Sequence, residues 1–223
     1  FAVCSEKDKS PSMVKIVKTN NQFSLTVNGK PFHVKGVGLG YKNDKNVIAL
    51  KEAGGNSFRT WGIAHLEQEL AIAEKLGLMI AVGIQTGKEI HGFDYNDQQA
   101  VTEQFHRVTA VIEKYKNHPN ILMWLISNEP NLLYDDQGKL KNVNPKVYSA
   151  LGDIIDYIHL HDPNHPVTFS LAGHNPNHVA HPGKTCRASH APRAFDHREL
   201  PQTYQSHAAV VYQSLCPSNL PDP

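Results

Sequence analysis

An unbroken apolar run that ends in a carboxylate constrains this chain more than any other feature. The run covers residues 121–127 and is followed by Asn128, Glu129 and Pro130. Continuous apolar strands are typical of parallel sheets, and in a βα barrel the carboxyl ends of the strands carry the catalytic groups. A glutamate beside a hydrogen-bonding asparagine suits general acid/base catalysis of glycoside hydrolysis. The alternative is that Asn128 caps a helix starting at Pro130 and that Glu129 lies on the surface.

The composition indicates one sizeable globular domain and excludes several partners. The chain has 223 residues, 22 basic and 21 acidic side chains and a net charge of +1. Without a basic run, neither nucleic acid nor an anionic membrane is an expected partner, and no apolar stretch reaches the length of a membrane span. Because the first residue is Phe1 rather than Met, we expect a processed, extracellular or periplasmic protein. Nothing in the sequence indicates an oligomeric state.

Local patterns predict alternating strands and helices after a small hairpin. The turn residues Asn20 and Asn28-Gly29 separate the short strands of the hairpin. After the hairpin, strand-like apolar runs alternate with segments whose apolar residues have helical spacing. Strands are expected near 34–38, 56–60, 78–83, 121–127 and 166–171. Repeated βα units imply a parallel sheet with helices outside it, and no Gly-x-Gly-x-x-Gly turn supports a dinucleotide fold.

The pattern changes near residue 183. Gly183 is the last glycine, and residues 184–223 contain five prolines and little strand-like alternation. We therefore expect a flexible lead-in over 1–12, a partial βα barrel over 13–183, and a poorly ordered tail over 184–223. The expected fold class is α/β, a (β/α)8 TIM-barrel type that is incomplete, with about five of its eight units and an N-terminal β-hairpin. The wide spacing of Cys4, Cys186 and Cys216 leaves one Cys186–Cys216 bridge open.

Four motifs in series resemble the catalytic barrel of glycoside hydrolase family 2 and its wider clan. They are Phe-His-Val-Lys-Gly-Val at 32–37, Asn-Ser-Phe-Arg-Thr-Trp-Gly at 56–62, Ala-Glu-Lys-Leu-Gly-Leu at 73–78, and the segment 117–130 that ends in Asn-Glu-Pro. The resemblance covers about residues 22–180. It implies a retaining glycosidase in which Glu129 is the acid/base, Asn128 hydrogen-bonds the sugar 2-hydroxyl, and Arg59 lies in the active site.

The second carboxylate that the family uses has no evident counterpart here. The resemblance implies a nucleophilic glutamate at the end of strand seven, but the only glutamate after Glu129 is Glu199, on no recognisable strand. Retaining hydrolysis needs two carboxyl groups about 5–5.5 Å apart. Three functions are therefore kept: a β-glycoside hydrolase that is inactive as it stands, a non-catalytic or vestigial sugar-binding barrel, and a glucan-remodelling transglycosidase, a relative from the same clan.

Three further side chains have a functional and a structural interpretation. Arg59 either positions the nucleophile through a bidentate hydrogen bond or forms an ion pair that stabilises the fold. Trp61 either stacks on a sugar ring or packs in the core. His91, in the loop after the third strand, either approaches the substrate or is a solvated loop residue.

No cofactor or metal is expected, because the histidines after residue 158 lack an ordered ligand pattern. We interpret them as surface and loop residues; they are His159, His161, His165, His174, His178 and His181.

Overall fold

The computed structural model describes residues 10–20 and 22–172, whose centre is a five-stranded parallel sheet. The strands lie in chain order, and each pairs with its neighbours in sequence. They are β4 (Gly36–Gly38), β5 (Ser57–Arg59), β6 (Met79–Ile84), β7 (Ile121–Asn128) and β8 (Val167–Ser170). The parallel order confirms the predicted partial barrel, and each strand lies within two residues of its expected position.

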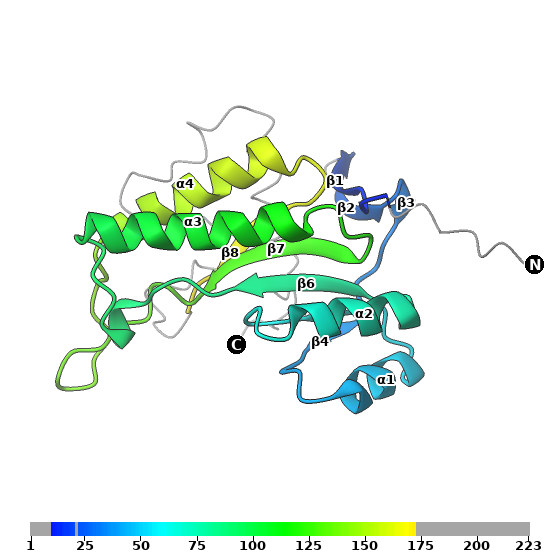
Figure 1. The fold of residues 1–223 in the computed structure, drawn as a ribbon, viewed down its shortest axis with the longest axis horizontal. Coiled ribbons are helices and arrows are strands. Elements are labelled where there is room, and N and C mark those ends of the chain that lie inside the picture. The colour runs from blue at the N-terminus through cyan, green and yellow to red at the C-terminus, as the bar shows by residue number, and fades with distance from the viewer. Residues whose placement is uncertain (1–9, 21, 173–223) are drawn as a thin grey trace, which may run out of the picture.

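Helices cover one side of this sheet, with α1 beside α2 and α3 beside α4 (Figure 1). They are α1 (Asp44–Glu52), α2 (Leu66–Leu76), α3 (Gln98–Tyr115) and α4 (Lys146–His161), and the short 3-10 turn η1 (Glu89–His91) precedes α3. Local chemistry sets their ends. The Asp97 side chain accepts the first free N–H groups of α3, and Gly77 ends α2 in the left-handed conformation at φ 64°.

The main core lies between the sheet and these helices. Trp124 and Ile126 of β7 are fully buried there, together with Ile112 of α3 and Leu151 of α4. Trp124 is therefore a core residue. Alternate residues of the strands face the other side, where a closed barrel has its interior. That side is the one from which Arg59 and Ser170 reach one another.

A three-stranded antiparallel sheet precedes the barrel strands. It consists of β1 (Val14–Thr19), β2 (Gln22–Val27) and β3 (Lys30–Pro31). Val14 is buried against Met79 and Leu122, which lie at the start of β6 and β7, so the hairpin covers the N-terminal end of the barrel. β3 is short, because after Pro31 the chain leaves this sheet to enter β4.

Several predictions lie outside the described residues. These are the 184–223 tail, most of the 1–12 lead-in, the three cysteines with their possible bridge, Glu199, and the histidines at 174, 178 and 181. Within the described ranges, none of the helices is both long and apolar enough to cross a membrane.

Candidate active site

An irregularity in β7 shapes the end of the strand that carries Asn128 and Glu129. Leu125 pairs with Thr168 of β8, but the next pair is Asn128 with Ser170, so β7 has one residue more than its partner. Ser127 and Glu129 both have positive φ angles, 70° and 53°. Such conformations cost a non-glycine residue on the order of 1–3 kcal/mol and cluster at functional sites. The bulge therefore re-aims the two polar side chains at the strand's carboxyl end.

Arg59 and Asn128 meet across the sheet. The Arg59 Nη2 atom donates to Asn128 Oδ1 at 2.6 Å, although β5 and β7 are separated by β6. On β6, Gly83 lies against the chain that leaves β5, because a Cβ there would be 2.1 Å from the Thr60 carbonyl oxygen. A guanidinium has only donors, so it fixes the amide with its oxygen toward Arg59.

Electrostatics connect Arg59 with Glu129. Burial lowers the pKa of the Arg59 guanidinium, and the negative charge of Glu129 acts in the opposite direction. The Glu129 backbone is held by a hydrogen bond from its N–H to the Ser170 carbonyl oxygen at 2.8 Å. The Arg59 Nε atom is buried and has no hydrogen-bond partner in the described part of the chain. The strand ends therefore present a carboxyl group, an amide and a partly unpaired guanidinium together.

Trp61 lies beside this group and is not a core residue. Its side chain is 41% exposed, and the Arg59 guanidinium lies 5.5 Å from its ring. The indole also lies against the Gly38 backbone, because a Cβ added to Gly38 would be 2.3 Å from Trp61 Cη2. Of the two interpretations of Trp61, core packing is therefore wrong. An exposed aromatic face beside the polar groups can stack on a sugar ring.

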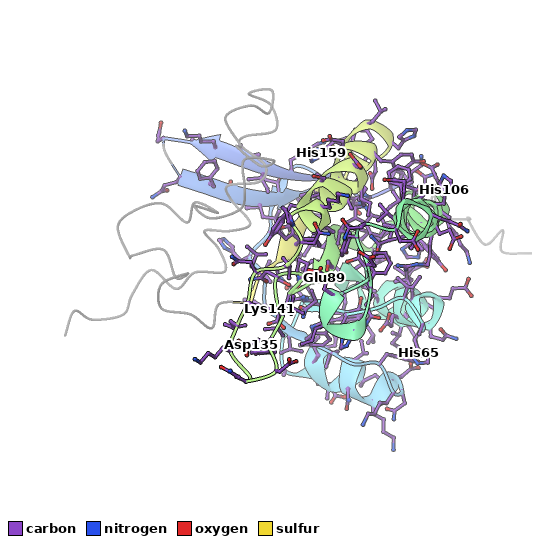
Figure 2. The ribbon with its side chains drawn as sticks, turned by 90° about the vertical axis from the view of Figure 1, so that its left-hand side faces the viewer. His65, Glu89, His106, Asp135, Lys141 and His159 are labelled. Carbon is purple, nitrogen blue, oxygen red and sulfur yellow. The ribbon has the colours of Figure 1, made fainter. Side chains whose placement is uncertain are left out.

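His91 lies at the same end of the sheet but outside this cluster. It is an exposed residue of η1, and its side chain hydrogen-bonds to none of the described residues. The loop that carries it is held by Glu89, whose Oε2 accepts from the Asn144 N–H at 2.6 Å. Figure 2, seen from the end where β6 finishes, shows Glu89 with Asp135 and Lys141 of the loop after β7. Glu89 and His91 both belong to η1, in the loop that follows β6.

Ser170 is a member of the site that the sequence analysis missed. It ends β8, and its hydroxyl donates to Asn128 Oδ1 at 3.1 Å and accepts from Arg59 Nη2 at 3.3 Å. A signal was present in the sequence, because a polar residue at the carboxyl end of an apolar strand is the same pattern that singled out Arg59.

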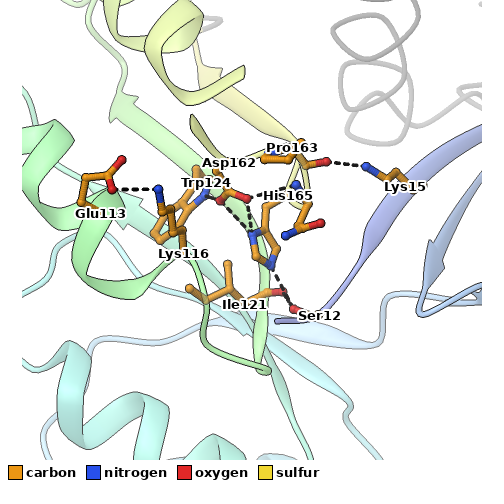
Figure 3. A network of polar contacts seen from close by, with 10 residues as sticks. Ser12, Lys15, Glu113, Lys116, Ile121, Trp124, Asp162, Pro163 and His165 are labelled. Carbon is orange, nitrogen blue, oxygen red and sulfur yellow. Dashed lines mark hydrogen bonds and ion pairs between the residues drawn. The ribbon is translucent and has the colours of Figure 1, made fainter. Parts of the chain in front are cut away.

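A buried serine, histidine and aspartate at the opposite end of the sheet form a structural network (Figure 3). His165 Nε2 lies 3.0 Å from Ser12 Oγ, and its Nδ1 lies 2.8 Å from Asp162 Oδ2. The distances resemble those of a nucleophilic triad. However, Ser12 is only 1% exposed and its hydroxyl donates to the Ile121 carbonyl at 2.6 Å, so no substrate reaches it and its proton is engaged elsewhere.

This network joins three distant segments and corrects one prediction. It connects the residues before β1 with the start of β7 and with the loop between α4 and β8, and Trp124 Nε1 donates to Asp162 at 2.6 Å. We interpreted His165 as a surface or loop residue. It does lie in a loop, but it is not on the surface, because it is only 4% exposed. The buried imidazole is stable there because both ring nitrogens have hydrogen-bond partners.

Among the described residues, no group of three potential ligands is arranged to hold a metal ion.

The parallel βα sheet, with a carboxyl group, an amide and a guanidinium gathered at its strand ends, defines a barrel of the glycosidase class. Comparison with known families makes the assignment specific. Residues 17–181 match the family model described as glycosyl hydrolases family 2, TIM barrel domain. The match covers most of the chain, so the chain belongs to this family.

Curated proteins that resemble the chain include β-glucuronidases. One, from Streptococcus agalactiae serotype V, is 29% identical over 136 residues, which is 50% of this chain and 22% of the relative. Another, from Chlorocebus aethiops, is 25% identical over 185 residues, or 75% of this chain and 25% of the relative. The chain thus spans about a quarter of the length of the relatives it matches.

Solved structures show the same fold. The Bifidobacterium dentium β-glucuronidase complexed with coumarin-3-O-glucuronide matches with a TM-score of 0.53 and 23% identity, over 74% of this chain and 27% of its own. A family 2 β-galacturonidase from Eisenbergiella tayi bound to galacturonate matches with a TM-score of 0.53 and 17% identity, over 71% of this chain and 28% of its own. At these identities the likeness establishes the fold alone.

Proposed function

We propose that this chain supplies the acid/base side of the active site of a retaining β-glycosidase. One observation carries the proposal: the bulged end of β7 places Glu129 next to an asparagine whose amide oxygen is held by Arg59. With its oxygen engaged, Asn128 turns its Nδ2 group away, and that group makes no hydrogen bond to a described residue. A free amide donor beside a carboxylic acid is suited to a sugar hydroxyl next to the scissile bond.

The chemistry then assigns a role to each group. Glu129 gives its proton to the leaving glycosidic oxygen while a second carboxylate attacks the anomeric carbon, and Glu129 next takes a proton from the water that releases the sugar. Residues 130–172 contain no glutamate, so the glutamate that the family resemblance implies at the end of strand seven is not among the described residues. The partly unpaired Arg59 guanidinium is suited to orient an incoming carboxylate by paired hydrogen bonds.

The proposed substrate is a β-linked uronide. Two observations support this choice: the curated relatives are named β-glucuronidases, and one structural neighbour is a β-galacturonidase with galacturonate bound. The polar strand ends beside the exposed Trp61 ring suit a sugar that has both polar edges and an apolar face.

A second candidate function is sugar binding without hydrolysis. It is favoured by the sequence between Glu129 and Glu199, which offers no glutamate for the nucleophile. In that case the same groups would bind a glycoside but leave it intact. A transglycosidase would break the bond and transfer the sugar to another saccharide, so the products distinguish it from a hydrolase.

The test is hydrolysis of nitrophenyl β-D-glucuronide, β-D-galacturonide and β-D-glucoside, with product analysis, by the 223-residue chain and by a longer protein in which residues 1–172 are joined to the remaining strands of a family 2 barrel. We expect uronides to be preferred, with little or no turnover by the 223-residue chain alone. In the longer protein Glu129→Gln should lower the rate on an unactivated disaccharide by about 10²–10⁴-fold, because the leaving group loses its proton donor. The loss should be smaller for nitrophenyl substrates.

The control is Glu103→Gln, which removes an exposed carboxylate on α3. It should leave the rate unchanged. An unaltered rate for Glu129→Gln on the unactivated disaccharide would refute the acid/base assignment. Binding of the uronide without any turnover in the longer protein would instead support the second candidate.

A further inference from the structure

Ser170 connects the two neighbouring residues that the proposed function relies on. Its hydroxyl reaches the Asn128 side chain, and its carbonyl oxygen accepts the Glu129 N–H at 2.8 Å. We propose that Ser170 is a positioning residue for Asn128: together with Arg59 it holds the amide oxygen, so that the Nδ2 group faces the sugar. The sugar part of this statement rests on the proposed function, whereas the orientation of the amide does not.

The positions of the hydrogens follow from the chemistry of the three side chains. Arg59 can only donate, and its Nη2 group donates both to Asn128 Oδ1 at 2.6 Å and to Ser170 Oγ at 3.3 Å. Because Ser170 Oγ accepts from Arg59, its single proton is available to Asn128 Oδ1, 3.1 Å away. Arg59 therefore selects the amide oxygen, because the opposite orientation would place an amide N–H group against the guanidinium donor, and the Ser170 hydroxyl adds a second hydrogen bond to that oxygen.

The register of the sheet explains why this contact exists at one position only. The extra residue in β7 moves the pairing so that Asn128, and not Ser127, lies opposite Ser170. Thr168, the other hydroxyl residue of β8, pairs with Leu125 and directs its hydroxyl to a backbone carbonyl. Thr168 therefore serves as a matched control, with the same strand and chemistry but no contact with the asparagine.

The side-chain contact can be separated from the backbone contact. Ser170→Ala removes the hydroxyl but retains the carbonyl that accepts the Glu129 N–H. Ser170→Thr retains a hydroxyl and should restore the contact. The comparison thus isolates the orientation of Asn128 from the backbone of Glu129.

The direct test is the NMR signal of the Asn128 side-chain amide in the 223-residue chain labelled with ¹⁵N-asparagine, assigned by its loss in Asn128→Asp. We expect Ser170→Ala to shift and broaden this signal, Ser170→Thr to restore it, and Thr168→Val to leave it in place. An Asn128 signal that is the same in Ser170→Ala and in the unaltered chain would overturn the proposal.

The second test uses binding and turnover of nitrophenyl β-D-glucuronide by the longer protein. Ser170→Ala should lower kcat/KM by about two- to tenfold, the range expected for one hydrogen bond. In an Asn128→Ala background it should have no further effect. An equal loss in both backgrounds would overturn the positioning role. If no glucuronide is turned over while the NMR signal shifts as expected, the positioning of Asn128 stands and the proposed function fails.

Discussion

The buried carboxyl group of Glu69 allows a direct test of how pH affects the stability of this fold. It lies on α2 and is only 3% exposed, and its Oε2 atom is buried without a hydrogen-bond partner among the described residues. Burial raises the pKa of this carboxyl group to about 7, from an ordinary value of 4.5. A carboxyl group that ionises reluctantly should make the stability of the fold depend on pH.

The sign follows from proton uptake. Between pH 4.5 and about 7 the folded chain keeps the Glu69 proton that the unfolded chain has already released, so the free energy of unfolding falls as pH rises through this window. The whole shift corresponds to about 3 kcal/mol at 1.36 kcal/mol per pKa unit. Relaxation of the surroundings around the ionised carboxylate lowers this penalty, so the expected effect is about 1–2 kcal/mol.

Glu69→Gln removes the charge and keeps the shape. We expect the variant to match the unaltered chain near pH 4.5 and to be more stable by about 1–2 kcal/mol at pH 8, where the carboxylate would be ionised. The assay is urea denaturation of the 223-residue chain at pH values from 4.5 to 8, with Glu52→Gln, an exposed residue of α1, as the control. A Glu69→Gln variant that is no more stable than the unaltered chain at pH 8 would refute the reasoning.

Two other substitutions test the ends of the sheet. Trp124→Phe removes the indole N–H that Asp162 accepts at 2.6 Å, so denaturation should show a loss of about 1–3 kcal/mol, and an unchanged midpoint would contradict the structural role of this network. Gly38→Ala should displace the Trp61 ring, because the new Cβ would lie 2.3 Å from Cη2, and fluorescence should report the change. Gly40→Ala, where nothing lies within 4 Å, is the control, and an equal change in both variants would exclude a specific contact.

Residue patterns within single segments were enough to predict most of the fold. The apolar run of β7 and the helical spacing of apolar residues in α3 indicate which side chains are buried. Capping residues indicate where the helices begin and end. Parallel order followed because repeated βα units have few alternative connections. The motifs at strand ends likewise indicated Arg59, Asn128 and Glu129, because strand ends of a parallel sheet meet at one edge.

Features that depend on the register between strands were decided only in the tertiary structure. The bulge at Ser127 brings Asn128 opposite Ser170, 42 residues away, and no local pattern encodes which residue of a strand faces which residue of its neighbour. The same holds for His165, whose contact with Ser12 spans 153 residues and explains its burial. The sequence by itself determined the elements, their order and the residue types at the strand ends. Tertiary packing decided how these side chains contact one another, because lateral register is a property of two segments together.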